Sequence, residues 1–403
     1  MAWNMHALIA FRGLQGLGAG AIMATVMTLA GDLYTVQERG AVQGWLSSVW
    51  GMAAIAGPLL GGAFAEYASW RWIFLVNLPI GALALLLVGR ELHETFHRRE
   101  ARIDVAGAVL LFVALSLLIF GVLEGGQAWP WASWQMGLIG VLAVLSLAAL
   151  VLVERRAAEP ILPGWLWRRR ELAGSNLAAI GMGLVMMAPS IFLPTFLQSV
   201  QGLGAIAAGF VLATLSLGWP AASALSPPLY ARFGFRDAGL FGCALILLAS
   251  LAFLWLPRPQ PVPWVLLDQV LLGAGLGFFS TPILVGMQST VDWGQRGVVT
   301  GSHMFARYLG QSLGAALFGA IFNAALGARL AGAPQALAGQ VPQTVDAVMG
   351  ALHSPATAPA VGAWLRGAMG AATDALYRGM SVIALLMLLV LLVAPRRFPV
   401  IEE

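Results

Sequence analysis

Eleven apolar stretches of about twenty residues or more recur along this chain, separated by short connectors. A helix rises 1.5 Å per residue, so about twenty residues cross the hydrocarbon core of a bilayer, which is about 30 Å thick. Lipid offers no hydrogen-bond partner for free backbone groups. An apolar stretch of this length that crosses the membrane must therefore satisfy its own backbone hydrogen bonds, which requires a helix. We therefore predict an all-α membrane protein with about eleven transmembrane helices. The predicted spans cover residues 5–31, 41–66, 70–90, 105–124, 134–153, 174–199, 205–228, 238–256, 264–287, 298–325 and 379–395.

Composition supports this class and excludes others. Of the 403 residues, 59% are hydrophobic and 10% are charged, against roughly 45–50% apolar and about 25% charged residues in a soluble domain. All basic residues are arginines, and most of them lie in short connectors, so no basic face for nucleic acid is expected. Cys243 is the only cysteine, which excludes a disulfide framework within the chain and a cysteine-based metal site. The sequence has no lysine and no P-loop motif, so we exclude ATP-driven pumping by this chain.

The arginines gather on alternate connectors, which indicates how the chain is oriented in the membrane. By the positive-inside rule the arginine-rich connectors are cytoplasmic. This places the C-terminus inside and the N-terminus of this chain outside, in the cytoplasmic (inner) membrane of a bacterium. The first residues lack a basic segment and a cleavage site, so we do not interpret them as a signal peptide. The longest outer connector, 326–378, is expected to form mobile turns or an interfacial helix.

The chain contains an internal repeat with an offset of 257 residues. This offset aligns GLGAG at 16–20 with GAGLG at 273–277, and ERGAVQG at 38–44 with QRGVVTG at 295–301. The offset spans eight predicted helices, an even number, so both copies cross the membrane in the same direction. We therefore predict two parallel pseudo-repeats, an arrangement that transporters use.

Glycines recur four residues apart in both copies of the repeat. Close helix contacts in lipid depend on small residues, so these pairs predict tight packing. The segment Gly57-Pro58-Leu59-Leu60-Gly61-Gly62 has a more specific, functional interpretation. Its proline removes a backbone hydrogen bond and bends the helix, and its glycines allow a close contact with a neighbouring helix that excludes water, or a pivot. We expect Gly57, Pro58, Gly61 and Gly62 to prevent proton leakage. The pairs are Gly16/Gly20, Gly40/Gly44, Gly57/Gly61, Gly273/Gly277, Gly297/Gly301 and Gly310/Gly314.

Four segments carry the more specific signals: RGLQGLG at 12–18, AAIAGPLLGG at 53–62, SWRWIFLVNLPIG at 69–81 and PLYARFGFR at 228–236. They resemble motifs of the major facilitator superfamily, specifically its fourteen-helix drug:proton antiporter branch. The first resembles the fourth-helix signature R-x-x-Q-G-x-G, and the second resembles the fifth-helix motif G-x-x-x-G-P-x-x-G-G with Ala53 in place of the first glycine. The third resembles a phrase typical of the branch. The fourth resembles a second-half copy of the loop motif G-x-L-x-D-R-x-G-R, with Ala231 in place of its aspartate.

The resemblance implies three regions. Residues 1–90 would be a remnant of the N-terminal bundle, equivalent to helices four to six of the family. Residues 91–173 would be a linker with two extra transmembrane helices and basic cytoplasmic loops, and residues 174–403 a C-terminal six-helix bundle. The first three helices of the family have no counterpart, so the sequence is interpreted as N-terminally truncated by about three helices. Two explanations remain open: the start of the gene was assigned too far downstream, or the chain is a true fragment.

Few ionisable residues lie deep within predicted spans, and three of these are candidates for proton coupling or gating, because charge in lipid costs about 2.5–3.5 kcal/mol on insertion scales. Arg12 is implicated in coupling by the family signature, and otherwise it binds backbone carbonyls. Asp268 is the candidate proton carrier, although its shallow position is also consistent with a hydrated group. Arg307 matches an arginine common in this branch, with structural and substrate-contacting roles both open.

Four further charged residues are assigned to the cytoplasmic loops and to conformational change. Asp32 ends the first span, where the family pairs an acid with arginines of the first-half loop. That loop is missing, so Asp32 should lack its expected partner. Arg39 and Arg296 occupy matching corners of the repeat and are expected to fix helix ends, and Arg232 belongs to the degraded loop motif.

Aromatic, sulfur-containing and amide side chains could line a cavity for bulky apolar cations, because rings attract cations and methionine adapts to shape. Lipid-facing or core-filling roles are the alternative. The candidates for the substrate cavity are Trp50, Met186, Phe192, Phe278, Met304, Tyr308 and Gln311.

A competing chemistry is suggested by His93-Glu94-Thr95-Phe96-His97, which matches the zinc-protease pattern H-E-x-x-H. We consider this alternative weak because Arg98 and Arg99 would repel a dication and no third ligand is marked. The sequence instead predicts a non-enzymatic exporter of lipophilic or cationic small molecules, of the multidrug efflux type, driven by proton antiport without a cofactor. Export of an endogenous metabolite or siderophore, and a non-transporting fragment, are the alternatives. The expected partners are the small-molecule substrate and the lipid bilayer, without nucleic acid; a periplasmic adaptor protein, the cargo, the proton stoichiometry and the oligomeric state are left open.

Overall fold

The computed structural model describes residues 3–69, 71–92, 104–125, 128–257, 260–337, 339–342, 344–354 and 356–401. Within these ranges the regular structure is helical, as predicted, and the sole β-bridge joins Gly125 to Trp129. The helices are α1 (Met5–Leu33), α2 (Val36–Tyr67), α3 (Trp72–Leu75), α4 (Asn77–Glu91), α5 (Val105–Glu124), α6 (Trp134–Glu154), α7 (Gly164–Arg168), α8 (Arg170–Ser199), α9 (Ala205–Ala213), α10 (Leu215–Phe233), α11 (Phe235–Trp255), α12 (Val262–Ser289), α13 (Trp293–Ala331), α14 (Val345–His353) and α15 (Pro359–Val393).

Each predicted span coincides with one long helix or with a pair of consecutive helices. Ten of them, counted over the described residues with α3 joined to α4 and α9 joined to α10, are long and apolar enough to cross a membrane. The remaining predicted span corresponds to α2, which is 32 residues long. The chain is therefore a multi-pass helical membrane protein.

The connector predicted over 326–378 is much shorter in the structure, and the expectation of mobile turns or an interfacial helix was wrong for most of that range. Helix α13 continues to Ala331, and α15 begins at Pro359, twenty residues before the predicted span. The added segment of α15 carries apolar residues on one face, and Val361, Leu365 and Leu376 are buried in the core. Polar residues interspersed in this segment lower its mean hydropathy, so the sequence did not predict a span there. The helix is stabilised by packing against the core instead. The short helix α14 lies between α13 and α15.

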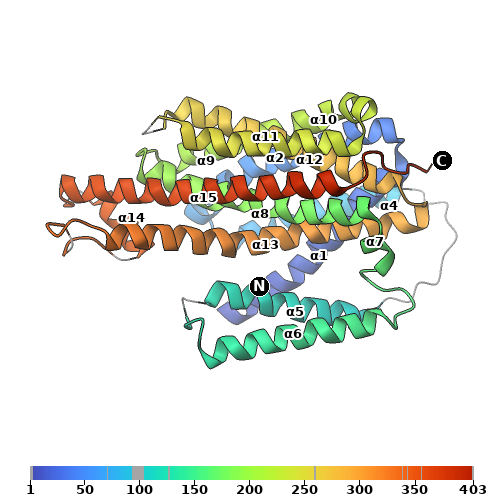
Figure 1. Cartoon of the computed structure of the whole chain (residues 1–403), viewed down its shortest axis with the longest axis horizontal. Helices are drawn as coiled ribbons and strands as arrows, with labels where there is room; N and C mark the ends of the chain where they lie inside the picture. Colours follow the sequence, from blue (N-terminus) through green and yellow to red (C-terminus); the bar gives the residue numbers. More distant parts are fainter. Residues whose placement is uncertain are drawn as a thin grey trace.

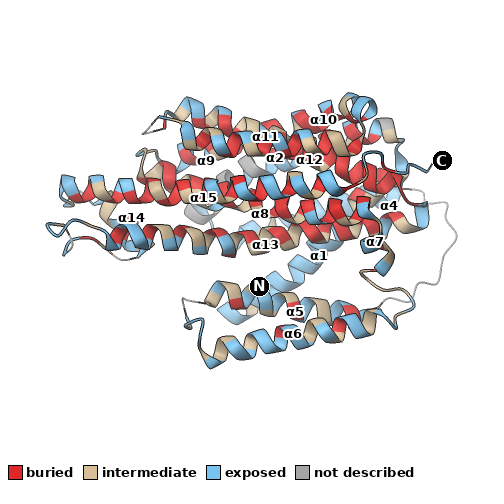
Figure 2. Cartoon of the chain, viewed as in Figure 1, coloured by how far each residue is buried: buried red, intermediate tan, exposed pale blue. Residues whose placement is uncertain are grey.

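The core lies in the C-terminal helices α8 to α15 (Figure 2). Helix α12 is the most buried of the candidate spans, with 72% of its most apolar window buried. It packs against α10 and α11, while α8 packs against α13 and α15. At the junction of α10 and α11, Gly234 adopts a φ of 91°, a conformation that favours glycine.

Helices α5 and α6 form a hairpin set apart from this bundle (Figure 1). They pack against each other, and α5 also contacts α13. Their outward side chains are largely apolar, including Phe112 and Val144, which are 66% and 65% exposed. An apolar exposed surface of this kind is appropriate for lipid.

The N-terminal helices meet the C-terminal bundle mainly through α2, which packs against α10. In contrast, the buried residues of α1 are Met27, Ala30 and Gly31, all near its C-terminal end. No described residue of α4 is buried. Much of α1 and α4 therefore presents apolar surface to the surroundings.

Glycine packing follows the prediction in three of the six pairs. A Cβ at Gly44 would lie 2.8 Å from the Ala224 Cβ, and Gly40 lies against Pro227, so this pair allows α2 to approach α10. Both members of Gly273/Gly277 and Gly310/Gly314 also lie against neighbouring helices. The prediction was wrong for Gly16/Gly20 and Gly297/Gly301, where a Cβ would meet nothing within 4 Å.

Candidate transport cavity

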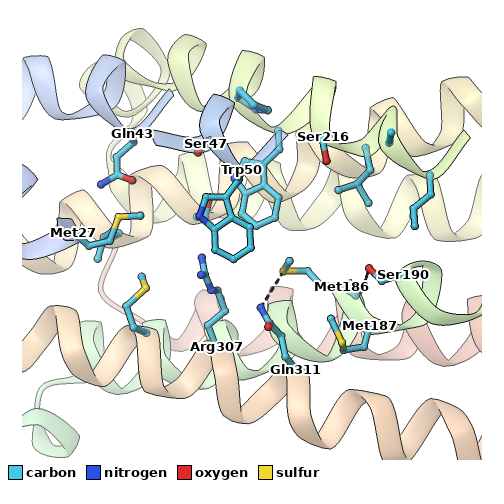
Figure 3. A pocket seen from close by; sticks show the side chains of 18 of the residues that line it. Met27, Gln43, Ser47, Trp50, Met186, Met187, Ser190, Ser216, Arg307 and Gln311 are labelled. Atoms are coloured by element: carbon cyan, nitrogen blue, oxygen red, sulfur yellow. Dashed lines mark hydrogen bonds between the residues drawn. The ribbon is translucent and has the colours of Figure 1, made fainter. Parts of the chain in front are cut away.

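A cavity of about 430 Å³ lies between the N-terminal helices and the C-terminal bundle. It is enclosed by α1, α2, α8, α9, α10, α12 and α13, and Figure 3 shows α2 facing α8 and α13 across it. Its walls are predominantly apolar, with a minority of hydroxyl and amide groups, as is typical of small-molecule sites. The lining residues are Met27, Gln43, Ser47, Trp50, Met186, Met187, Ser190, Pro194, Gly209, Leu212, Ala213, Leu215, Ser216, Trp219, Pro220, Ser280, Leu284, His303, Met304, Arg307 and Gln311.

The structure brings together four of the seven side chains predicted for a substrate cavity: Trp50, Met186, Met304 and Gln311. The Gln311 Nε2 donates to the Met186 Sδ at 3.7 Å, which links α13 to α8 (Figure 3). This hydrogen bond therefore fixes the positions of the Gln311 amide and the Met186 sulfur beside the cavity.

The other three predicted side chains do not line it. Phe192 stacks on Phe322 with ring centroids 4.8 Å apart, and Phe278 makes an edge contact with Phe241 at 5.2 Å. Tyr308 packs beside the cavity, where its hydroxyl accepts a hydrogen bond of 3.5 Å from Arg307. Aromatic residue type alone cannot separate packing rings from cavity-lining rings.

Arg307, a candidate for coupling or gating, points into the cavity toward Trp50 (Figure 3). Its guanidinium carbon lies 5.7 Å from the Trp50 ring centroid and 5.1 Å from that of Tyr308. Cation–π contacts at this range stabilise a charge by about 0.5–2 kcal/mol. The arginine thus belongs to the cavity wall.

Sequence reasoning missed several polar groups of the cavity. Gln43 and Ser47 precede Trp50 on α2, and all three line the cavity. Their spacing of four and three residues places them on one helix face, which is a signal that the sequence contains. His303 lies one turn before Arg307 on α13 in the same way, and it is 1% exposed.

Asp268, the candidate proton carrier, lies in α12 away from this cavity and is 5% exposed. The Gln269 Nε2 donates to its Oδ2 and to the Tyr377 hydroxyl, both at 3.1 Å. The Tyr377 ring stacks on Phe253 with centroids 3.7 Å apart. Among the described residues the Asp268 Oδ1 has no hydrogen-bond partner. A buried, incompletely satisfied carboxyl group is a candidate to bind and release a proton.

The structure does not join the remaining coupling candidates to either site. Arg12 is exposed on α1, where its Nη1 donates to the Gln15 Oε1 at 2.8 Å. Gly57 is exposed on α2, and a Cβ there would meet nothing within 4 Å. The helix continues through Pro58, Gly61 and Gly62, whose packing lies outside what the structure describes.

A reciprocal contact joins the two copies of the repeat at one end of the bundle. The Arg296 Nη1 lies 3.5 Å from the Asp32 Oδ1 and donates to the Gly31 carbonyl at 3.4 Å. The Arg39 Nη1 lies 3.5 Å from the Ser289 Oγ, and its Nε donates to the Tyr34 carbonyl at 2.9 Å.

The 257-residue offset relates Arg39 to Arg296 and Asp32 to Ser289, so each copy makes the same contact with the other. The ends of α1 and α12 therefore meet the starts of α13 and α2, as two copies threaded in the same sense require. Asp32, which was expected to lack the partner that the family provides, is paired in the structure with Arg296 of the second copy of the repeat.

Arg232 lies in the last turn of α10, where its guanidinium carbon is 5.2 Å from the Phe233 ring centroid. With Arg396 and Arg397 it lines a second, shallower cavity of about 500 Å³. The zinc-protease candidates His93, Glu94 and His97 lie outside the described residues. Within the described ranges no group of three or more His, Cys, Asp or Glu side chains is placed to hold a metal ion.

The fold and the cavity together define a class: a multi-pass membrane protein with an apolar cavity between helices of two repeats, which is an arrangement of transporters. A family model of the Major Facilitator Superfamily matches residues 1–106 and 96–315. The chain belongs to the Major Facilitator Superfamily.

Curated relatives support the same family. The chain is 31% identical over 315 residues to Multidrug resistance protein 3 of Bacillus subtilis (strain 168), a match covering 78% of this chain and 61% of that protein. It is 29% identical over 314 residues to Multidrug transporter protein MdtP of the same strain, with 78% and 58% coverage. It is 28% identical over 322 residues to Efflux pump FUS6 of Gibberella fujikuroi, again with 78% and 58% coverage. The matches thus span about three fifths of the length of these relatives.

Proposed function

We propose that this protein exports lipophilic small molecules across the cytoplasmic membrane of a bacterium in exchange for protons. The observation that carries the proposal is the cavity of about 430 Å³ between the two sets of helices, lined by Trp50, Trp219 and four methionine side chains. Figure 3 labels Trp50 and three of these methionines, Met27, Met186 and Met187. Aromatic and methionine side chains suit cargoes of varied shape. The names of the multidrug and efflux relatives support the direction of transport.

Alternating access would proceed by movement of the N-terminal helices against the C-terminal bundle. The reciprocal Arg39 and Arg296 contacts hold the two sets of helices together at one end of the bundle in this structure. The arginine distribution assigns that end to the cytoplasm, with the C-terminus inside and the N-terminus of this chain outside. Opening toward the cytoplasm would therefore require these contacts to separate.

The coupling role is assigned to Asp268, with the proton gradient as the energy source and no cofactor. Asp268 lies apart from the cargo cavity, so proton binding would act on cargo indirectly, through the position of α12. Helix α12 supplies Ser280 and Leu284 to the cavity wall, which gives a physical connection between the two sites.

Efflux from cells tests the proposal. Cells that express the chain are loaded with a panel of lipophilic dyes, and the loss of dye is followed with and without a protonophore. A version extended upstream by three helices is measured in parallel, because the matched relatives are longer. Protonophore-sensitive efflux of at least one dye is the expected result. Efflux by the extended version alone would show that this chain is insufficient, and no efflux by either version would contradict the proposal.

A further inference from the structure

The cavity contains a buried positive charge without a counter-charge. Arg307 is 7% exposed and forms no ion pair with any residue that the structure describes. The side-chain hydrogen bond it donates goes to Tyr308, and its Nε has no partner among the described groups. None of the lining side chains that the structure describes is a carboxylate. A buried ion without a partner costs several kcal/mol, so this guanidinium requires compensation.

The aromatic neighbours compensate only part of this cost. Trp50 and Tyr308 approach the guanidinium with their rings, which attract a cation but carry no net charge. A second polar group nearby also lacks a partner in the described part of the chain: the Nδ1 of His303, one helical turn away on α13. The cavity wall therefore contains two side chains, each more than nine-tenths buried, in which one polar atom has no partner among the described residues.

These observations determine the charge of a suitable cargo. A cationic cargo would place a second positive charge near Arg307 in an apolar cavity, where like charges repel strongly. An anionic group would instead neutralise the guanidinium and accept its free donors, as carboxylates and phosphates do in bidentate pairs with arginine.

We propose that the cavity binds amphiphilic anions, with the acidic group on Arg307 and the aromatic or alkyl body against Trp50, Trp219 and the methionines. This inference rests on the proposed function for its cargo site, and it narrows the lipophilic or cationic cargo expected from the sequence to lipophilic compounds that carry an acidic group. Arg307 is then a substrate-binding residue rather than a coupling residue.

Equilibrium binding of two probes with the same body tests this inference. The protein is placed in nanodiscs of zwitterionic phosphatidylcholine, so that no anionic headgroup competes. Binding of 4-(1-pyrenyl)butyrate and 4-(1-pyrenyl)butylammonium is followed by energy transfer from the tryptophans, with empty nanodiscs subtracted. The butyrate is expected to bind at least about tenfold more tightly, equivalent to about 1.4 kcal/mol.

Variants then assign the preference to the side chain. Arg307→Gln should lower the affinity for the butyrate by about tenfold or more while leaving the affinity for the ammonium probe unchanged or improved. Arg307→Lys keeps the charge and should retain much of the preference. Arg329→Gln removes an exposed arginine at the C-terminal end of α13, outside the cavity, and should change neither affinity. Thermal unfolding of each variant checks that it is folded.

Several outcomes would overturn the inference: equal or tighter binding of the ammonium probe, a preference that survives Arg307→Gln in folded protein, or no binding of either probe. Repeating the measurement with phosphatidylglycerol in the nanodisc separates the source of the anion. If phosphatidylglycerol weakens binding of the butyrate probe, the occupant of the site is an anionic lipid. That result still supports an anion-binding site at Arg307. The binding measurements need no gradient, so they are independent of the efflux assay. If the cells export dyes but the purified protein binds the ammonium probe more tightly than the butyrate, this inference is refuted and the proposed function stands. An anionic preference without efflux would refute the proposed function alone.

Discussion

At the residue scale, the buried ionisable side chains Arg307 and Asp268 lie at different sites. Arg307 faces the cavity from α13, whereas Asp268 lies in α12 with Gln269 and Tyr377. The sequence placed both inside spans, which was enough to nominate them. It could not assign them to different sites, because that depends on which helix faces are in contact.

Replacement of Asp268 tests the coupling role. Asp268→Asn keeps the size of the side chain and can keep the hydrogen bond from Gln269, but it removes the proton-binding carboxyl group. We expect dye efflux to lose its dependence on the pH gradient while the thermal unfolding midpoint changes little. The measurement is efflux at several imposed gradients.

Gln340→Glu, at an exposed position of the connector between α13 and α14, serves as a charge-changing control and should transport normally. Gradient-dependent efflux by a folded Asp268→Asn variant would remove Asp268 from the coupling mechanism.

At the element scale, the sequence predicted helix existence well and helix ends less well. All eleven spans were found, yet α15 is much longer than predicted because Val361, Leu365 and Leu376 pack into the core. Hydropathy averages over a window and so registers lipid exposure, whereas helix ends depend on tertiary contacts. The same limit explains why only some of the glycine pairs pack as predicted. Their spacing indicated possible helix contacts, but whether a contact forms depends on which neighbouring helix lies against them.

The repeat provides a matched pair that tests glycine packing. The offset relates Gly18 to Gly275. A Cβ at Gly275 would lie 2.8 Å from the Ile246 backbone nitrogen, whereas a Cβ at Gly18 would meet nothing within 4 Å. Gly275→Ala should therefore lower the free energy of unfolding by about 1–3 kcal/mol through overpacking between α11 and α12.

Gly18→Ala should be neutral or stabilising by up to about 1 kcal/mol, because alanine favours a helix. Thermal or denaturant unfolding in detergent measures both variants. Equal effects of the two substitutions would contradict the packing that the structure describes.

At the scale of the whole molecule, the two copies of the repeat exchange equivalent contacts at one end of the bundle. Arg39 reaches Ser289 and Arg296 reaches Asp32, and both arginines are at least 95% buried. The charges of Arg39, Arg296 and Asp32 also interact with one another. The sequence predicted that the arginines fix helix ends, but the cross-repeat partners emerge only when the copies are placed side by side.

Removing one of these arginines should favour the separated state of the two sets of helices. We expect Arg296→Gln to increase reaction of a cysteine introduced at Ser47 in the cavity with a membrane-impermeant thiol reagent added from the cytoplasmic side. Cys243 is fully buried and should remain unreactive. Arg397→Gln, at an exposed position of the C-terminal segment, is the control and should leave the labelling rate unchanged. A rate unaffected by Arg296→Gln would mean that these contacts do not control access.

The most direct test of the account is transport by purified protein in liposomes under an imposed pH gradient, comparing two tryptophan substitutions on α2. Ser47 lines the cavity, whereas Val49 is 57% exposed and does not. The account predicts gradient-driven flux of a lipophilic probe that is lost in Ser47→Trp and retained in Val49→Trp. Undiminished flux through a folded Ser47→Trp variant would contradict the claim that cargo crosses the membrane through this cavity.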